Sequence, residues 1–293
     1  DYAIVEPGMY YRDFERAVAE KGLLLPPYPA SKDLCAIGGM VANNAGGEKT
    51  LRYGKMEDYV EELTVILSDG EEHVIRPLTE RELKAKFAED GVEGDLYRKI
   101  HTLLSENFDV IARARPNVAK NSAGYFLWNI WDKKSGIFDL TKLIVGSQGT
   151  LCIVAEAKLR LIEDVSQKES HSHLTVIFLN DPAQLAKIVN VIVQFHPESV
   201  ESYDDNTFKL ALKFFPGFLK KMGAKNIIML GIRFLPEFFL LLRGGIPKMV
   251  LLADFHGKDE PAVHAQFDSL RRALMPFKVR VRGITRNKDA KKY

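Results

Sequence analysis

The residues with the clearest chemical potential form a run of small and amide side chains, residues 36–47 (AIGGMVANNAGG). Two glycine pairs, Gly38-Gly39 and Gly46-Gly47, leave the main chain without bulky cover. Backbone N–H groups at such a place can approach a flat or anionic ligand closely. The alternative is a glycine-rich turn that packs two elements tightly. The spacing excludes a GxGxxG dinucleotide motif and a GxxxxGK[ST] phosphate loop.

The histidines are weak candidates for a metal site. Asp254 lies two residues before His256 and shares its face of a predicted strand. His264 belongs to the following helix, and two ligands without a third make a poor site. His171 and His173 fall in a polar joint between domains. The sequence therefore predicts no metal site and gives these histidines no ligand role.

Acidic and basic clusters have ordinary structural explanations. Glu201, Asp204 and Asp205 precede a predicted helix over 208–214, and an aspartate there is a preferred N-cap. The basic residues at 220–221 and 288–292 are typical of a solvated surface or tail.

Composition bounds the class of protein. The sequence has 293 residues, of which 46% are hydrophobic and 27% charged, so it is folded rather than disordered and long enough for about two domains. A net charge of +2 is too balanced to predict nucleic-acid binding. Cys35 and Cys152 lie outside any CxxC motif, which excludes a disulfide scaffold and suits a reducing, cytoplasmic compartment.

Two segments bear on where the protein lies in the cell and on whether the sequence starts at a domain boundary. The sequence begins with a strand pattern at Asp1 and no signal peptide, so we expect it to start in the middle of a domain. Residues 227–243 (IIMLGIRFLPEFFLLLR) are apolar but contain Arg233, Pro236 and Glu237, and they are shorter than the roughly 20 apolar residues a spanning helix needs. We expect a helix buried in its own domain, with peripheral membrane contact as the alternative.

Periodicity and turn signals predict a mixed α+β first half. The expected elements are a helix over 10–21, a proline-rich extension over 23–31, a hairpin of 63–67 with 73–75, helices over 79–87 and 95–107, and strand-like segments at 143–145 and 151–161.

A charged, serine-rich joint at 163–173 marks the predicted domain boundary, which we place between residues 164 and 165. Beyond it we expect strands at 174–179, 199–203, 249–255 and 278–282, with helices over 183–195 and 261–274 and a helix-rich insertion after the second strand. Two βαβ-like halves predict a ferredoxin-like sheet covered on one face by helices.

The order of the motifs is similar to that of a known family. The motifs are Val5-Glu-Pro-Gly8, Pro27-Tyr-Pro-Ala-Ser31, the glycine run, Arg52-Tyr-Gly54, Asp58-Tyr-Val60, Val65-Ile-Leu-Ser-Asp-Gly70, Asn121-Ser-Ala-Gly-Tyr125 and Gly146-Ser-Gln-Gly-Thr-Leu151. Together they resemble the FAD-linked oxidoreductases of the vanillyl-alcohol oxidase and p-cresol methylhydroxylase (PCMH) type. The branch they resemble is that of the D-lactate, glycolate and D-2-hydroxyglutarate dehydrogenases.

The resemblance implies an α+β protein, with a PCMH-type FAD-binding domain over residues 1–164 and a ferredoxin-like cap, or substrate, domain over 165–293. Three departures are Met40, Gln148 and Cys152, where similar proteins often have Asn, Glu and Gly. Matched motif by motif, the resemblance places these residues at the FAD: Pro29, Ser31, Ile37, Gly38, Gly39, Asn43, Ala45, Gly46, Gly149 and Ile153.

A second group, Lys120, Asn121 and Tyr125, lies in a motif that the resemblance places near the flavin. A lysine or tyrosine there could orient a substrate carboxylate or hydroxyl, which makes these residues catalytic candidates. The alternative is a capped loop in which Asn121 and Ser122 satisfy backbone groups. Both interpretations are open at this stage.

The resemblance implies an enzyme that oxidises a small 2-hydroxy acid by hydride transfer to FAD N5 and passes the electrons to an acceptor. Relatives have a phosphate-binding loop before Val5, and a substrate-binding arginine with, in many, a His-rich metal motif beyond Tyr293. We therefore expect a chain truncated at both ends, with most of a flavin site and little of a substrate site. The alternative function is a non-catalytic fragment or interaction module that keeps the fold.

Overall fold

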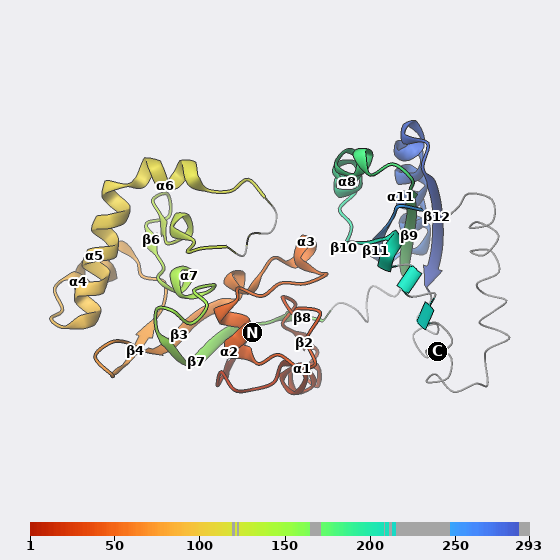
Figure 1. The fold of residues 1–293 in the computed structure, drawn as a ribbon. Helices are drawn as coiled ribbons and strands as arrows, with labels where there is room; N and C mark the ends of the chain where they lie inside the picture. The colour runs from red at the N-terminus through yellow and green to blue at the C-terminus, as the bar shows by residue number, and fades with distance from the viewer. Residues whose placement is uncertain are drawn as a thin grey trace. The chain divides into compact units, whose positions relative to one another are not determined.

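A computed structural model describes residues 1–118, 121, 123–164, 171–207, 209–210, 213–214 and 247–286. The chain divides into two compact units, Asp1–Val165 and Ser166–Tyr293 (Figure 1). Each unit has its own hydrophobic core. Lys120, the apolar segment 227–243 and the basic residues at 220–221 and 288–292 lie outside the described residues. No helix in the described part is long and apolar enough to cross a membrane.

The first unit is built on an antiparallel sheet of the order β1-β7-β3-β4 (Figure 1). The hairpin of β3 and β4 forms where Asp69-Gly70 predicts it, and Gly70 has the positive φ of +82° that such a turn requires. The strands are β1 (Tyr2–Val5), β3 (Val60–Ile66), β4 (Glu72–Ile75) and β7 (Ile153–Arg160).

Helices and short pairings surround this sheet. Thr79 caps the helix predicted over 79–87, because its side chain accepts from the N–H of Glu82 while the Glu82 carboxylate accepts from the N–H of Thr79. The elements are α1 (Tyr11–Ala19), α2 (Ile37–Ala42), α3 (Thr50–Tyr53), η1 (Met56–Asp58), α4 (Glu80–Phe87), α5 (Val92–Glu106), α6 (Phe108–Ala114), η2 (Leu127–Asn129) and α7 (Thr141–Ile144), with the strand pairs β2 (Leu23–Leu24) with β8 (Ile162–Glu163) and β5 (Trp131–Asp132) with β6 (Ile137–Phe138).

The predicted strand at 143–145 is wrong, because these residues belong to or follow α7. The carboxylate of Asp139 accepts from the N–H of Thr141 at 2.9 Å and from its hydroxyl at 2.6 Å, which starts a helical turn. Gly146, with a φ of +87°, ends the turn. Three apolar residues in a row are too few to separate a strand from a buried helical turn by periodicity.

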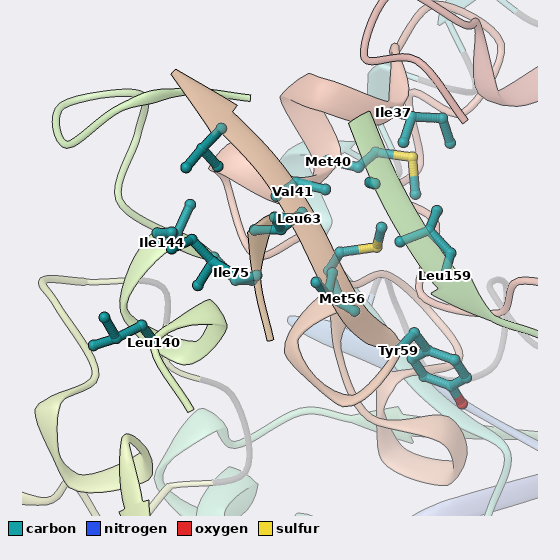
Figure 2. Packing of buried hydrophobic residues seen from close by; sticks show 14 of the residues in the cluster. Ile37, Met40, Val41, Met56, Tyr59, Leu63, Ile75, Leu140, Ile144 and Leu159 are labelled. Atoms are coloured by element: carbon teal, nitrogen blue, oxygen red, sulfur yellow. The ribbon is translucent and has the colours of Figure 1, made fainter. Parts of the chain in front are cut away.

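The glycine run forms the short helix α2, and its apolar face is part of the core. Ile37, Met40 and Val41 are at most 1% exposed and follow the i, i+3, i+4 spacing of a buried helix face. Figure 2 shows them beside Leu63 and Leu159 of the sheet. Burial of this stripe fixes α2 on the sheet and leaves Gly39 on the outer side.

The second unit has a four-stranded antiparallel sheet among its described residues, of the order β10-β11-β9-β12. Strands β9 and β10 are both antiparallel to β11, and β11 and β12 are both antiparallel to β9, so each of these two pairs is parallel. The segments β9-α8-β10 and β11-α11-β12 therefore form two interleaved βαβ units. This is the ferredoxin-like arrangement predicted from the sequence. The elements are β9 (His171–Leu179), η4 (Pro182–Gln184), α8 (Leu185–Val193), β10 (Ser199–Asp204), β11 (Met249–Gly257), α11 (Glu260–Leu274), η6 (Met275–Phe277) and β12 (Arg280–Arg286).

The core of this unit lies between one sheet face and the two helices. Ile177 of β9 and Leu251 of β11 pack with Ile188 of α8 and Leu270 of α11, and all four are at most 1% exposed. The acidic cluster behaves as a cap, because Asp204 Oδ1 accepts from the N–H of Thr207 at 2.8 Å.

His171 and His173 lie in strand β9 and not in a polar joint, which corrects the sequence-based expectation. His173 is buried, with its ring centroid 4.3 Å from that of Phe267. Burial, followed by the nearby His264, lowers the pKa of His173. The ring fits because Gly283 on β12 has no side chain: a Cβ there would stand 2.4 Å from His173 Nε2 and 2.8 Å from Phe267.

We therefore expect Gly283→Ala to lower the free energy of unfolding of the second unit by about 1–3 kcal/mol, because the core must move to admit a methyl group. Denaturant unfolding measures the change. Gly8→Ala is the control, since a Cβ at Gly8 would meet no described atom within 4 Å. Unfolding of the Gly283→Ala variant at the wild-type midpoint would contradict this account of the packing.

His73 connects the hairpin of the first unit to helix α5. Its Nδ1 lies 3.1 Å from a carboxylate oxygen of Glu93, and its Nε2 lies 2.9 Å from one of Asp69. Burial lowers the pKa of His73, but the hydrogen bonds and charges of Glu93 and Asp69 outweigh it and raise the pKa above its usual value. The imidazolium is therefore favoured in the folded chain.

Because the folded-state pKa of His73 is raised, its contribution to stability is complete below the unfolded pKa of about 6.5 and is lost as the pH rises through the folded value. We expect His73→Gln to reduce the free energy of unfolding more at about pH 6 than at about pH 9. Urea titrations of both proteins at the two pH values measure this difference. An equal loss at both values would show that the ring acts by packing alone.

Candidate functional site

Helix α2 is tied to the end of strand β1 by its first two backbone donors. The N–H of Ile37 donates to the carbonyl of Met9 and the N–H of Gly38 to that of Pro7, each at 2.9 Å. A Cβ on Gly38 would stand 2.5 Å from Pro7 Cβ. Gly38 therefore serves close packing, which is the alternative that the sequence left open for this run.

Gly39, the next residue, has a different environment. It is exposed, and a Cβ there would meet no described atom within 4 Å. The same holds for Gly8, just beyond Pro7, and for Gly149. These glycines present bare main chain to the outside, which is the surface that a flat ligand needs.

The second glycine-containing turn, residues 146–150, packs on the end of α2. The N–H groups of Gly146 and Gln148 donate to the carbonyls of Val41 and Ala42 at 3.0 and 2.9 Å. The bond to Ala42 satisfies a carbonyl that a helix end leaves unpaired, and Val41 accepts from Asn44 as well. The Gln148 side chain also donates to Asn43 Oδ1 at 3.2 Å. The exposed residues Gly39, Asn43 and Gly149, predicted separately, thus belong to two segments in direct contact.

Asn44 is a residue that the sequence analysis did not single out. It is 1% exposed, with a φ of +47°, and its Oδ1 accepts from the N–H of Glu57 at 2.9 Å. Its buried Nδ2 has no hydrogen-bond partner among the described residues. An unsatisfied buried donor costs about 1–3 kcal/mol, so an acceptor on a bound ligand would stabilise it. Asparagine adopts positive φ more readily than most residues, and this is the sequence signal that could have drawn attention to Asn44.

The third segment, Asn121 to Phe126, reaches the same place. The Tyr125 hydroxyl lies 2.8 Å from Thr150 Oγ1, so this exposed tyrosine is at the second turn. Asn121 Oδ1 accepts from the N–H of Ala123 at 3.0 Å, which is the loop-capping role of the alternative interpretation. Its backbone carbonyl accepts from Lys55 Nζ at 3.1 Å. Lys120 lies outside the described residues.

The remaining predicted cofactor residues differ in exposure. Ile37 and Ala45 are buried, and the Ala45 N–H donates to the carbonyl of Met40 at 2.9 Å, so both support α2 from within. Gly47 lies against Tyr28, since a Cβ there would stand 2.2 Å from the Tyr28 carbonyl oxygen. This contact brings the proline-rich segment to the glycine run. Ser31 and Ile153 are exposed, while Pro29, Gly38 and Gly46 are half-buried.

Neither Cys35 nor Cys152 is activated as a nucleophile. Burial raises the pKa of the Cys152 thiol to about 11, and burial is also the main cause of the raised pKa of Cys35. Both are therefore protonated near neutral pH, and a thiol is a poor nucleophile. Within the described ranges, no group of three histidine, cysteine, aspartate or glutamate residues is arranged to hold a metal ion.

The class of the first unit follows from a comparison of its sequence with known families. Residues 1–76 match the family described as FAD binding domain. This stretch contains β1, the proline-rich segment, the glycine run and the hairpin, so the match covers α2 and its anchor. The resemblance to FAD-linked oxidoreductases of the PCMH type is confirmed, and FAD is the cofactor of this domain.

Curated relatives point to one branch. The chain is 26% identical over 209 residues to a D-2-hydroxyglutarate dehydrogenase of Pseudomonas putida, which aligns 71% of this chain with 20% of the relative. It is 31% identical over 206 residues to glycolate oxidase subunit GlcD of Bacillus subtilis, with 70% of this chain and 32% of the relative aligned. The aligned region thus spans about a fifth to a third of these relatives' length.

Solved structures confirm the fold. A structure of alkyldihydroxyacetonephosphate synthase aligns with 96% of this chain and 39% of its own, at a TM-score of 0.55 and 15% sequence identity. The predicted fold class, a PCMH-type FAD-binding domain followed by an α+β unit, is confirmed.

The described residues fit FAD in two respects. Gly39 and Gly149 offer open main chain where a ring or diphosphate can approach without meeting a side chain. The unpaired Nδ2 of Asn44 is a buried donor next to the second turn, since Asn44 Cβ lies 3.2 Å from where a Cβ of Gly146 would stand. No charged group is needed for such a surface, because amide donors and dispersion hold a neutral ring.

The two neighbouring glycines of α2 should respond differently to the same substitution. We expect Gly38→Ala to lower the free energy of unfolding by about 1–3 kcal/mol, because its methyl group overlaps Pro7. Gly39→Ala should leave stability unchanged or raise it by about 0.5–1 kcal/mol, since alanine is the better helix former. Denaturant unfolding of both variants tests this, and a large loss for Gly39→Ala would show that its surroundings are closed.

Proposed function

We propose that this chain is part of an FAD-dependent oxidoreductase that oxidises a small 2-hydroxy acid of the D-lactate, glycolate or D-2-hydroxyglutarate type. The observation that supports the proposal is the contact of α2 with the turn 146–150 through Val41 and Ala42, since each of these two segments carries an open glycine. The FAD binding domain match and the names of the relatives agree with it.

When bound, FAD supplies the redox chemistry by accepting a hydride at N5 from the α-carbon of the acid. The chain's own part is to hold and orient the cofactor. In this proposal Gly39 and Gly149 give the main-chain surface, Asn43 and Gln148 form a neutral amide pair beside it, and Asn44 donates its free Nδ2 hydrogen. The other predicted residues support this surface from behind or at its rim.

Substrate orientation is the proposed role of Lys120, Asn121 and Tyr125. Tyr125 is exposed and hydrogen-bonded to Thr150, so its hydroxyl stands at the rim of the proposed cofactor surface, where it can meet a substrate hydroxyl or carboxylate. We further propose that residues 1–164 are the cofactor domain and that 165–293 are the substrate, or cap, domain.

The test is the visible spectrum of the purified chain after incubation with FAD and removal of free cofactor. We expect a yellow protein that is bleached under anaerobic conditions by at least one of D-lactate, glycolate and D-2-hydroxyglutarate. Gly39→Ala should fold as stably as the wild type yet retain about tenfold less FAD, because its methyl group enters the cofactor's space. Lys158→Met, on β7, is a control that should retain FAD.

Three outcomes separate the possibilities. A colourless wild-type chain would overturn the proposed cofactor site. A yellow chain that none of the acids bleaches would favour the alternative, a non-catalytic fragment that keeps the fold. Equal FAD retention by wild type and Gly39→Ala would show that the cofactor does not lie on α2.

A further inference from the structure

A buried lysine lies directly behind the segment that carries Tyr125. Lys55 is 8% exposed, and its ammonium nitrogen lies 2.8 Å from Glu57 Oε1, 3.1 Å from the Asn121 carbonyl oxygen and 4.6 Å from the centre of the Phe126 ring. We propose that Lys55 is a positioning residue that fixes the Tyr125 segment (residues 121 and 123–126) at the turn 146–150. The functional meaning of this placement rests on the proposed function.

A buried ammonium group is costly unless a counter-charge and further acceptors surround it. Glu57 supplies the counter-charge at 2.8 Å, and an ammonium group has three donors to place. The Asn121 carbonyl takes a second donor, and the Phe126 ring face attracts the cation. An apolar side chain of the same length would leave the Asn121 carbonyl without this donor. The ammonium group therefore holds the Tyr125 segment in addition to forming the ion pair with Glu57.

The anchor of the ion pair is rigid because Glu57 is held by several elements. Its Oε2 accepts from the Asn129 side chain at 3.1 Å, and its N–H donates to Asn44 Oδ1 at 2.9 Å. Its backbone carbonyl accepts from the Lys142 ammonium. The same group therefore connects Lys55 to the glycine run through Asn44 and to helix α7 through Lys142.

The Tyr125 segment is held by a hydrogen bond at Asn121 and by another at Tyr125. Lys55 holds Asn121, and the Tyr125 hydroxyl meets Thr150 2.8 Å away. Between them the chain reverses at Gly124, whose φ is +72°. Phe126 is 2% exposed under the ammonium and stacks on Trp128 with ring centroids 5.3 Å apart. Release of the Asn121 end would free the backbone that aims Tyr125.

The experiment compares hydrogen exchange in the full chain without FAD. Lys55→Met/Glu57→Gln removes both buried charges together, so no lone charge remains. We expect amide exchange in peptides covering residues 121–129 to become about tenfold faster or more, while peptides of β3 and β9 keep wild-type rates. The matched control is Lys158→Met/Glu61→Gln, which removes a half-buried pair whose charged atoms are 3.8 Å apart in the same unit and should leave these exchange rates unchanged.

A conservative variant separates positioning from general support. Lys55→Arg keeps the cation and a donor for Asn121, and we expect it to restore protection of residues 121–129 to within about threefold of wild type. Wild-type exchange rates in Lys55→Met/Glu57→Gln would overturn the proposal. So would faster exchange spread evenly over the first unit, because that is the result of a purely structural role.

A measurement on the wild-type chain decides the matter if the variants fail to fold. The ammonium ¹⁵N resonance of Lys55 should show a scalar coupling across the hydrogen bond to the carbonyl carbon of Asn121. Absence of the coupling in a spectrum that resolves the resonance overturns the proposal. Neither readout uses flavin, so a chain that fails to bind FAD disproves the proposed function and leaves this result to be judged separately.

Discussion

Two backbone hydrogen bonds at the end of helix α2 hold the candidate site together. The carbonyls of Val41 and Ala42 at the end of α2 accept from the N–H groups of Gly146 and Gln148. This places two glycine-containing segments, about a hundred residues apart in the chain, against each other. The bond geometry depends on positive φ at Gly146, Gln148 and Gly149, so the turn can close on the helix only with a backbone that most side chains disfavour. Every proposed contact with the cofactor depends on this junction.

Burial and exposure divide the glycine run into a side packed in the core and an open side. Ile37, Met40 and Val41 anchor α2 in the core, and the close contact of Gly38 with Pro7 sets its distance from strand β1. Gly39 is then left facing outward with nothing above it. Tight packing is thus the role that the structure shows for Gly38, while ligand contact is the role that we propose for Gly39.

A buried charged network lies behind the Tyr125 segment. Lys55 and Glu57 compensate each other, and their remaining hydrogen-bonding capacity is used by Asn121, Asn129 and Asn44. The proposed cofactor surface, in contrast, uses the amide pair of Asn43 and Gln148 and the open main chain of Gly39 and Gly149. The network also gives the loop residue Asn121 a defined position, because a buried charged group restricts its neighbours to the few arrangements that satisfy it.

The sequence by itself determined the elements with strong local signals. The hairpin at Asp69-Gly70, the capped helix α4 and the alternating strands and helices of the second unit follow from turn chemistry and periodicity, and the ordered motifs indicated the family. Only the tertiary structure decided the rest. The strand expected at 143–145 is instead the end of helix α7 and the residue after it, because Asp139 binds the N–H of Thr141 and starts a helical turn. His173 is buried because Gly283 from a distant strand makes room. The pairing of Asn44 with Glu57 and of Tyr125 with Thr150 also lay beyond the sequence, since hydrogen bonds between remote segments depend on where the whole chain places them.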